Sequence, residues 1–347
     1  MPRGAALQSE ILKEPELVDA DFAVYMVNRD ILAKVANWPR TGPGGPGRWI
    51  RHVGRAGAPA IAPGDVINLS IWDSEENSLL TSPGQKEVQM LNLTVSTDGM
   101  IFVPYIGDVN VARKTADEAR RHIQGQMETI VPAAQVQLAV TSGRGNSVDL
   151  VGGVTKPGNY PLAGENFTLL NLVSLGGGIP ATLRNPQVRL IRGNRVHSTS
   201  ISRLYADPGL DTVLQGGDKV IIEEDKRFFM ALGAAGNESL IYFEKDRVTA
   251  LEAMSMIGGI TDNRADPQGI LVLREYPQSA VHGDEIKGPP KARAVFVIDL
   301  TSADGLFSAG KFEIFAGDTV LATESPVTAV ESVFAVIGRM FGIASNL

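Results

Sequence analysis

The chain of 347 residues contains no cysteine and only four histidines. Because thiolates are common ligands of structural zinc and of iron–sulfur clusters, the absence of cysteine excludes such sites, together with disulfide frameworks and cysteine nucleophiles. The histidines lie far apart in the sequence, and no two of them have the spacing of metal ligands. We therefore predict no metal centre and no cofactor. The histidines are His52, His122, His197 and His282.

The chain also has little positive charge. Its 32 lysines and arginines against 39 acids give a formal net charge of -7. Since nucleic-acid-binding proteins present a basic surface, we predict no nucleic-acid partner. No charged start followed by an apolar run opens the sequence, so we expect no signal peptide within it. A hydrophobic fraction of 44% and a charged fraction of 20% are typical of globular domains, and the length allows two or three of them.

Familiar catalytic motifs are missing as well. The sequence contains no Gly-x-Ser-x-Gly, no P-loop and no His-Glu-x-x-His. Clustered acids support general acid–base chemistry on a glycan only where the fold brings two carboxyl groups to about 5–9 Å. Adjacent acids are usually solvated loop charges, so we predict that the chain is not an enzyme. The acids that a glycan-processing enzyme would use are Glu75, Glu76, Glu223 and Asp225.

Composition divides the N-terminal part of the chain. Within residues 1–38, the apolar residues Phe22, Val24 and Met26 occupy every second position, which predicts a strand, and the residues after them predict a short helix. Glycine and proline dominate residues 39–59, and so dense a run sustains neither a helix nor a sheet ladder. We therefore predict an N-terminal strand and helix segment, followed by a linker.

Residues 60–141 form the first predicted domain. A strand with alternating apolar residues opens it, and the pair Asp98 and Gly99 is typical of a two-residue hairpin turn. Thr115 and Glu118 have the spacing of a capping box, which starts a helix. A further alternating strand closes a module of strand, hairpin, helix and strand.

The remainder of the chain contains an internal repeat. Residues 168–179 match residues 249–260, and shorter stretches on either side match at the same offset without a gap, which indicates a duplicated domain. Each copy predicts strands, a short helix ended by glycines, and a closing strand after a Gly-Asp pair. The predicted domains span residues 146–225 and residues 226–324. The second carries an insertion at about residues 277–294, whose composition is typical of an exposed loop.

Residues 325–347 form an amphipathic tail. Its only charged residues after the helix start are Glu331 and Arg339, and at 100° per residue its apolar side chains gather on one half of a helix. A helix over residues 327–345 would be about 28 Å long at about 1.5 Å per residue, close to the roughly 30 Å of a bilayer's hydrocarbon core.

Two interpretations of this tail remain open. Several copies would ring a water-filled lumen, with their apolar sides toward lipid and small residues between neighbouring helices. Alternatively, the tail is a terminal helix docked on its own domain. For the first interpretation the predicted pore-lining residues are Glu331, Arg339, Thr328 and Ser332, the lipid-facing residues are Val330, Phe334, Ile337 and Phe341, and the helix-packing residues are Ala335, Gly338 and Gly342.

A set of motifs resembles the polysaccharide-export domain of Wza-type outer-membrane proteins. A second set is similar to the SLBB β-grasp repeat that follows this domain in the same family, and the resemblance covers residues 60–323. The chain departs from the family pattern at Arg113, where the family more often has glycine, and at the turn after Gly233, where a Lys-Pro-Gly-Tyr motif is missing; the family's lipidated cysteine is absent too. The export motifs are residues 63–66, 95–107, 115–119 and 132–136, and the SLBB motifs are residues 152–161 and 175–178.

The resemblance implies an α+β fold: a polysaccharide-export domain, two β-grasp-like SLBB domains and a C-terminal amphipathic transmembrane helix. It implies an outer-membrane location, with most of the chain in the periplasm, and a homo-oligomeric ring, often an octamer, whose helices form a barrel through the lipid. Capsular or exopolysaccharide would pass through this translocon, handed on by an inner-membrane polysaccharide co-polymerase. The competing hypothesis is a soluble periplasmic glycan-binding β-grasp protein without a pore.

Overall fold

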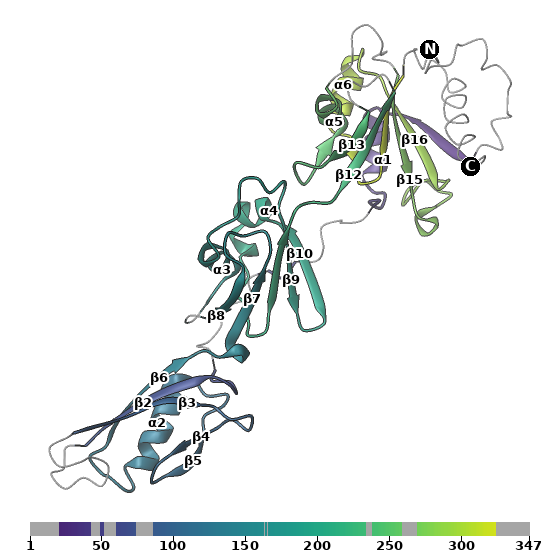
Figure 1. Cartoon of the computed structure of the whole chain (residues 1–347). Coiled ribbons are helices and arrows are strands. Elements are labelled where there is room, and N and C mark those ends of the chain that lie inside the picture. The colour runs from purple at the N-terminus through teal and green to yellow at the C-terminus, as the bar shows by residue number, and fades with distance from the viewer. Residues whose placement is uncertain are drawn as a thin grey trace, which may run out of the picture. The chain divides into compact units, whose positions relative to one another are not determined.

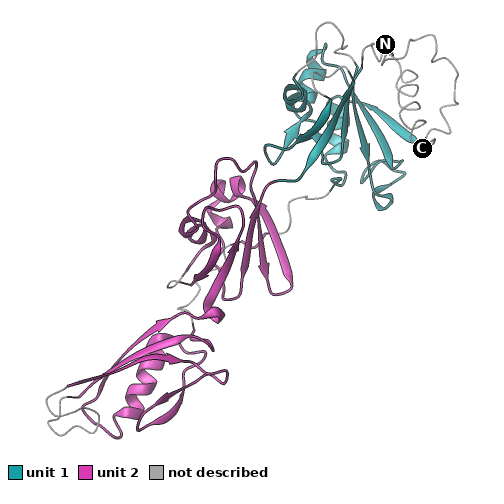
Figure 2. Ribbon diagram, in the orientation of Figure 1, with its two compact units in different colours: residues 1–45, 225–347 teal, residues 46–224 magenta. Residues whose placement is uncertain are grey.

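The computed structural model describes residues 21–42, 49–51, 60–73, 86–162, 164, 166–233, 238–258 and 269–323. Most helices and strands are labelled in Figure 1. The chain divides into two compact units, coloured separately in Figure 2. Unit 1 combines residues 1–45 with residues 225–347, and unit 2 is residues 46–224. Unit 1 is therefore built from two stretches that are far apart in the sequence.

The first module of unit 2 packs one helix against antiparallel strands. The middle strand β2 pairs with β3 on one side and β6 on the other, and its alternate residues Ile67, Leu69 and Ile71 are buried. The capping box of Thr115 and Glu118 is present at the start of the helix, as predicted. The elements are β2 (Val66–Trp72), β3 (Glu87–Thr94), β4 (Met100–Val103), β5 (Gly107–Asn110), α2 (Ala116–Met127) and β6 (Gln135–Thr141).

The turn predicted at Asp98 and Gly99 is present, but its loop is one residue longer than predicted. The Gly99 N–H donates to the Ser96 carbonyl and the Ser96 N–H donates to the Met100 carbonyl, both at 2.9 Å. This is the pattern of a three-residue hairpin loop, in which Gly99 takes the left-handed position with a φ of 82°. A two-residue turn would need a positive φ at Asp98 as well. Beyond the turn, β4 forms its ladder with β5.

The second module of unit 2 is a five-stranded sheet covered by short helices. The strand order is β10-β9-β11-β7-β8, and β7 and β11 are parallel. Thr168 caps its first helix, and Gly176 follows the last turn, in agreement with the predicted short helix ended by glycines. The elements are β7 (Ser147–Val151), β8 (Gly158–Pro161), α3 (Leu169–Leu175), β9 (Gln187–Arg192), β10 (Arg195–Ser200), α4 (Ile201–Ala206), the 3₁₀ turn Pro208–Leu210 and β11 (Lys219–Glu223).

Unit 1 repeats this plan and adds a strand. Its sheet has the order β1-β16-β15-β18-β12-β13, so the last five strands follow the order of the second module of unit 2. The sequence duplication is thus also a structural one. The elements are β1 (Phe22–Met26), α1 (Arg29–Val35), β12 (Phe228–Gly233), β13 (Ser239–Tyr242), β14 (Val248–Thr249), α5 (Ala250–Met256), β15 (Ile270–Glu275), the 3₁₀ turn Gln278–Ala280, β16 (Arg293–Ile298), α6 (Ala303–Ala309), β17 (Glu313–Ile314) and β18 (Thr319–Ala322).

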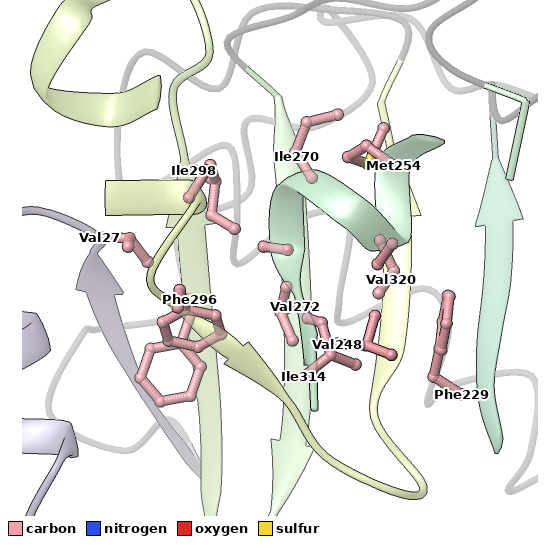
Figure 3. Packing of buried hydrophobic residues seen from close by; sticks show 14 of the residues in the cluster. Val27, Phe229, Val248, Met254, Ile270, Val272, Phe296, Ile298, Ile314 and Val320 are labelled. Carbon is pink, nitrogen blue, oxygen red and sulfur yellow. The ribbon is translucent and has the colours of Figure 1, made fainter. Parts of the chain in front are cut away.

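The N-terminal strand and helix complete unit 1. The predicted strand is β1, which pairs in parallel with β16, and the predicted helix is α1. Tyr25 and Trp38 are buried in the core of the unit, where both contact Phe296. Figure 3 shows part of this core, to which strands from both stretches of the chain contribute.

The insertion of the second copy is only partly the exposed loop that was predicted. Ala280 and Pro289 are buried, and the indole N–H of Trp38 donates to the backbone carbonyl of Glu285 at 3.0 Å. The loop is held because the N-terminal segment packs against it, and composition alone does not reveal such a partner. Ile286 at its tip is exposed, as expected.

Candidate functional site

The predicted pore residues lie outside the described part of the chain. These are Glu331, Arg339, Thr328, Ser332, Val330, Phe334, Ile337, Phe341, Ala335, Gly338 and Gly342, and their roles stay predictions. Over the residues that the structure does describe, no helix has both the length and the apolarity required to cross a bilayer. Nor do any three His, Cys, Asp or Glu side chains in those ranges lie close enough to hold a metal ion together.

One turn recurs in all three modules, each time just before a sheet strand. Its aspartate is Asp65, Asp218 or Asp318, and each carboxylate accepts the backbone N–H three residues earlier at 2.8 Å. The preceding glycines have φ values of 87°, 83° and 88°, a region that other residues seldom enter. The Gly-Asp pairs noted in the sequence therefore mark one structural device that starts β2, β11 and β18.

The partner of this aspartate differs between the modules. In both repeats an arginine of a neighbouring strand binds it in a bidentate pair: Arg192 with Asp218, and Arg274 with Asp318, at 2.9 and 2.6 Å in each case. Asp65 instead accepts neutral donors, among them the side-chain amide of Asn146 at 2.7 Å. The repeats thus share an ion pair that the first module lacks.

The ion pair of unit 1 is sealed from water. The side chains of Arg274 and Asp318 are 0% and 1% exposed, whereas Arg192 in the equivalent pair is 22% exposed. The Arg274 guanidinium lies 3.8 Å from the centre of the Phe315 ring, a cation–π contact. Burial alone would lower the pKa of Arg274, but the charge and hydrogen bonds of Asp318 outweigh it and raise this pKa above its ordinary value. Arg274 is therefore a charged core residue.

The acids considered for catalysis form ion pairs where they are described. Glu223 contacts Arg189 at 2.8 Å, and the carboxylate of Asp225 is held by Arg227 at 2.7 Å. Glu75 and Glu76 lie outside the described residues. These pairs neutralise the carboxylates, as structural ion pairs do.

The SLBB-like motif of the first repeat closes on the end of its own helix. The backbone N–H of Lys156 donates to the Gly176 carbonyl at 2.7 Å, and that of Thr155 donates to Gly178 at 3.2 Å. The hydroxyl of Tyr160 donates to the Lys156 carbonyl at 2.6 Å. The motif and the glycines after α3 are therefore one structure, which leaves the Lys156 side chain exposed.

Sequence reasoning missed a pair of exposed aromatic residues. Tyr205 on α4 and Phe307 on α6 are 61% and 74% exposed. Both follow a serine N-cap by five residues, at Ser200 and Ser302, so they occupy the same place in the two repeats. An alignment that extended the repeat to these serines would have found them. Exposed aromatic side chains at matching positions are typical of contact surfaces.

Comparison with known families agrees with this architecture. Residues 55–141 match the family described as polysaccharide biosynthesis/export protein, and residues 147–203 match the SLBB domain. A mixed α+β chain that carries these two modules in this order has the domain organisation of polysaccharide export proteins.

Individual relatives show which polysaccharide export proteins the chain is similar to. The capsule polysaccharide export protein BexD of Haemophilus influenzae is 28% identical over 81% of this chain and 75% of its own. The capsule polysaccharide export outer membrane protein CtrA of Neisseria meningitidis is 26% identical over 77% of this chain and 73% of its own. The EPS I polysaccharide export outer membrane protein EpsA of Ralstonia nicotianae is 29% identical over 75% and 69%. The chain thus carries the export and SLBB domains of Wza-type polysaccharide export proteins, a family of transport components, and two of these three relatives are named as outer-membrane proteins.

Proposed function

We propose that the chain is one subunit of a homo-oligomeric ring that exports capsular or exopolysaccharide through the outer membrane. The observation that carries this proposal is the succession of an export module and an SLBB module in a chain whose relatives are named as capsule or exopolysaccharide export proteins. Most of the chain would lie in the periplasm, where an inner-membrane polysaccharide co-polymerase would hand the glycan on.

The repeats would form the ring and the tail would form the pore. Tyr205 and Phe307 offer apolar contact area at matching positions of two successive modules, which suits the packing of identical subunits. Residues 325–347 from about eight subunits would then line a barrel in the outer-membrane lipid, with Glu331 and Arg339 toward water.

Such a protein acts by providing a wet path, and it needs no catalytic residue. A hydrated glycan loses many hydrogen bonds when it enters hydrocarbon, and each unsatisfied polar group is costly there. A lumen lined by Glu331, Arg339, Thr328 and Ser332 would replace those hydrogen bonds and leave the glycan solvated. Phe334 and Phe341 on the opposite side of the helix would face lipid.

The test compares the full chain with a chain that ends at residue 324. We expect the full chain in detergent to give a closed ring of about eight copies of 37.0 kDa and to insert into lipid vesicles, which it then makes permeable to a trapped fluorescent dextran. The shortened chain should still fold but should no longer insert. Equal partition of both into vesicles would refute the tail's role. A full chain that stays a single 37.0 kDa particle and binds oligosaccharide would favour the soluble glycan-binding protein.

Matched substitutions in the tail test its orientation. Phe334→Asp places a charge on the predicted lipid-facing side and should abolish insertion, because a carboxylate in hydrocarbon is expensive. Ser332→Asp adds the same charge on the predicted lumen side, and insertion should persist. If the two variants insert equally, the assignment of the two sides is wrong.

A further inference from the structure

The sheet of unit 1 has a second apolar face, opposite the core of the unit. Along a strand, successive side chains point to opposite faces. Ile270 and Val272 of β15 point into the core, as Figure 3 shows, so Leu271 and Leu273 point to the other side. We call this other side the outer face, and its residues form an apolar cluster of their own. The cluster consists of Phe22, Val24, Leu232, Leu271, Leu273, Val295, Val297 and Leu321.

The equivalent face of the first repeat carries charged and polar side chains among its apolar ones. The backbone N–H groups of Asp149 and Met230 both donate to the aspartate of the recurring turn, so these residues occupy matching positions. Asp149 accepts a hydrogen bond from Asn159 at 2.9 Å, whereas Met230 pairs with Leu240 on the neighbouring strand. The Arg189 side chain on β9 likewise forms an ion pair with Glu223. Of the two described copies, unit 1 is therefore the one whose outer face forms an apolar cluster, whereas in the other copy the half-buried Ile191 and Ile221 lie among charged residues.

The centre of the outer face is shielded from water. Leu271, Val295, Val297 and Leu321 are at most 5% exposed. The helices α5 and α6 place buried side chains in the main core, on the opposite side of the sheet, and the half-buried apolar side chains of α1 pack against the same core. The outer face is thus apolar and shielded from water, yet these three helices lie on the other side of the sheet. This is what is expected of a surface on which a further segment docks.

We propose that the outer face binds the amphipathic tail of the same chain, residues 327–345, whenever the tail is outside a membrane. The tail follows directly from the sheet, since Leu321 of β18 belongs to the outer face and the described chain ends at Thr323. So short a link keeps the local concentration of the tail at about millimolar or above. A partner that must diffuse from elsewhere has no such advantage.

Size and chemistry also match. Six strands spaced about 4.8 Å apart make a sheet roughly 24 Å wide. A helix of nineteen residues is about 28 Å long and carries its apolar side chains on one half of its surface. The tail can therefore cover the outer face and keep its polar half, with Glu331 and Arg339, in water. This arrangement would hold the chain soluble before it reaches the outer membrane.

This proposal rests on the proposed function in one respect: it assumes that the same tail leaves the outer face when it enters lipid. The absence of cysteine allows a direct test in the full chain, because a single introduced thiol is then the only one. Phe334→Cys places it on the apolar side of the tail. In buffer without detergent, we expect a maleimide reagent to modify this cysteine slowly.

A charge on the outer face should release the tail. Adding Leu273→Glu should speed the modification of Cys at position 334 at least about tenfold, because an apolar helix cannot cover a carboxylate. The control is Ile191→Glu, at the matching half-buried position of unit 2, which should leave the rate unchanged. In a version of each variant that also carries Trp49→Phe and Trp72→Phe, unchanged fluorescence of Trp38 verifies that unit 1 is still folded. Fast modification in the chain without either glutamate would overturn the proposal.

A second measurement identifies the occupant and avoids reliance on the charged variant. Leu273→Cys is combined in turn with Val330→Cys, Phe334→Cys or Ile337→Cys, and the protein is oxidised. An intramolecular disulfide in at least one pair supports docking of the tail. Disulfide-linked dimers would assign the outer face to a second copy of the chain, and no disulfide in any pair would leave the face without the tail; both results overturn the proposal.

Vesicles separate this proposal from the proposed function. A tail that is protected in buffer but never enters vesicles would leave docking intact and refute the pore. A tail that enters vesicles but is modified rapidly in buffer would leave the pore intact and refute docking.

Discussion

The sealed ion pair of unit 1 makes a quantitative prediction. Asp318→Asn keeps an oxygen that can accept the Phe315 N–H, but it removes the charge that balances Arg274. Removing one partner of a buried pair typically costs about 3–5 kcal/mol, because the other charge stays buried without compensation. At a urea m value of roughly 2 kcal/mol per molar, this corresponds to a midpoint lower by about 2 M. The expected effect is thus a large loss of stability confined to unit 1.

The three tryptophans allow each module to be followed alone. Trp38 is buried in unit 1, Trp49 donates its indole N–H to Leu210 in the second module of unit 2 at 2.7 Å, and Trp72 lies on β2. Replacing two of them by phenylalanine leaves a single reporter. Urea unfolding of the Trp38-only protein then measures the free energy of unfolding of unit 1, even if the modules unfold separately.

A matched variant makes the reasoning refutable. Asp218→Asn removes the same charge from the pair with Arg192, which water reaches, so the Trp49 transition should lose only about 1–2 kcal/mol. Adding Arg274→Met to Asp318→Asn removes the unpaired charge and should recover part of the loss. The reasoning fails if Asp318→Asn costs no more than Asp218→Asn, or if the double variant is no more stable than Asp318→Asn alone.

Two further predictions concern single residues. Arg113 is exposed and has a φ of 63°, which costs a residue with a side chain about 1–2 kcal/mol, so Arg113→Gly should raise the stability of the first module by roughly 0.5–1 kcal/mol in a Trp72-only protein; a loss of stability would contradict this. Burial, and then the carboxylate of Glu285, raises the pKa of Tyr25 above its ordinary value of 10.0. The folded state therefore holds this proton more tightly, and its stabilising effect is complete below pH 10 and is lost as the pH rises further. Between pH 9 and pH 11 the Trp38 transition should fall less steeply in Tyr25→Phe; an unchanged slope would contradict the assignment, although burial also raises the pKa of Tyr276 and leaves some slope.

Local patterns predicted local structure well. The capping box of Thr115 and the alternation in β1 and β2 depend on neighbours within four residues, and all are confirmed. Pairing between strands far apart in the sequence was harder to predict, because the alternation of apolar residues shows that a segment forms a strand but does not identify its partner. That is why the turn at Asp98 and Gly99 was predicted while the ladder between β4 and β5 was not.

No prediction was made from the sequence for the charged residue in the core of unit 1. Arg274 follows four apolar residues, and as a charged residue it reads as the end of a buried run. The structure buries it because Asp318 and the ring of Phe315 surround its guanidinium. The signal was present in the duplication, since each copy has an arginine near the end of the first strand after its capped helix, Arg192 on β9 and Arg274 on β15. The pore residues of the tail stay predictions, and the experiments on residues 325–347 decide them.

The parallel pairing of β1 with β16 leads to a last prediction: residues 225–323 alone should not form a stable unit 1. Without residues 21–42, β16 becomes an open edge, and the pockets of the buried Tyr25 and Trp38 stand empty. A peptide of residues 21–42 should restore the fold when it is added in trans. The larger fragment contains no tryptophan, so a blue shift of the peptide's Trp38 reports binding directly. The same peptide with Tyr25→Asp should bind much more weakly, because it places a charge in the aromatic core. The prediction is wrong if the larger fragment folds cooperatively by itself and does not bind the peptide. The five remaining strands would then form a complete domain, and the N-terminal segment would not be part of the folding unit.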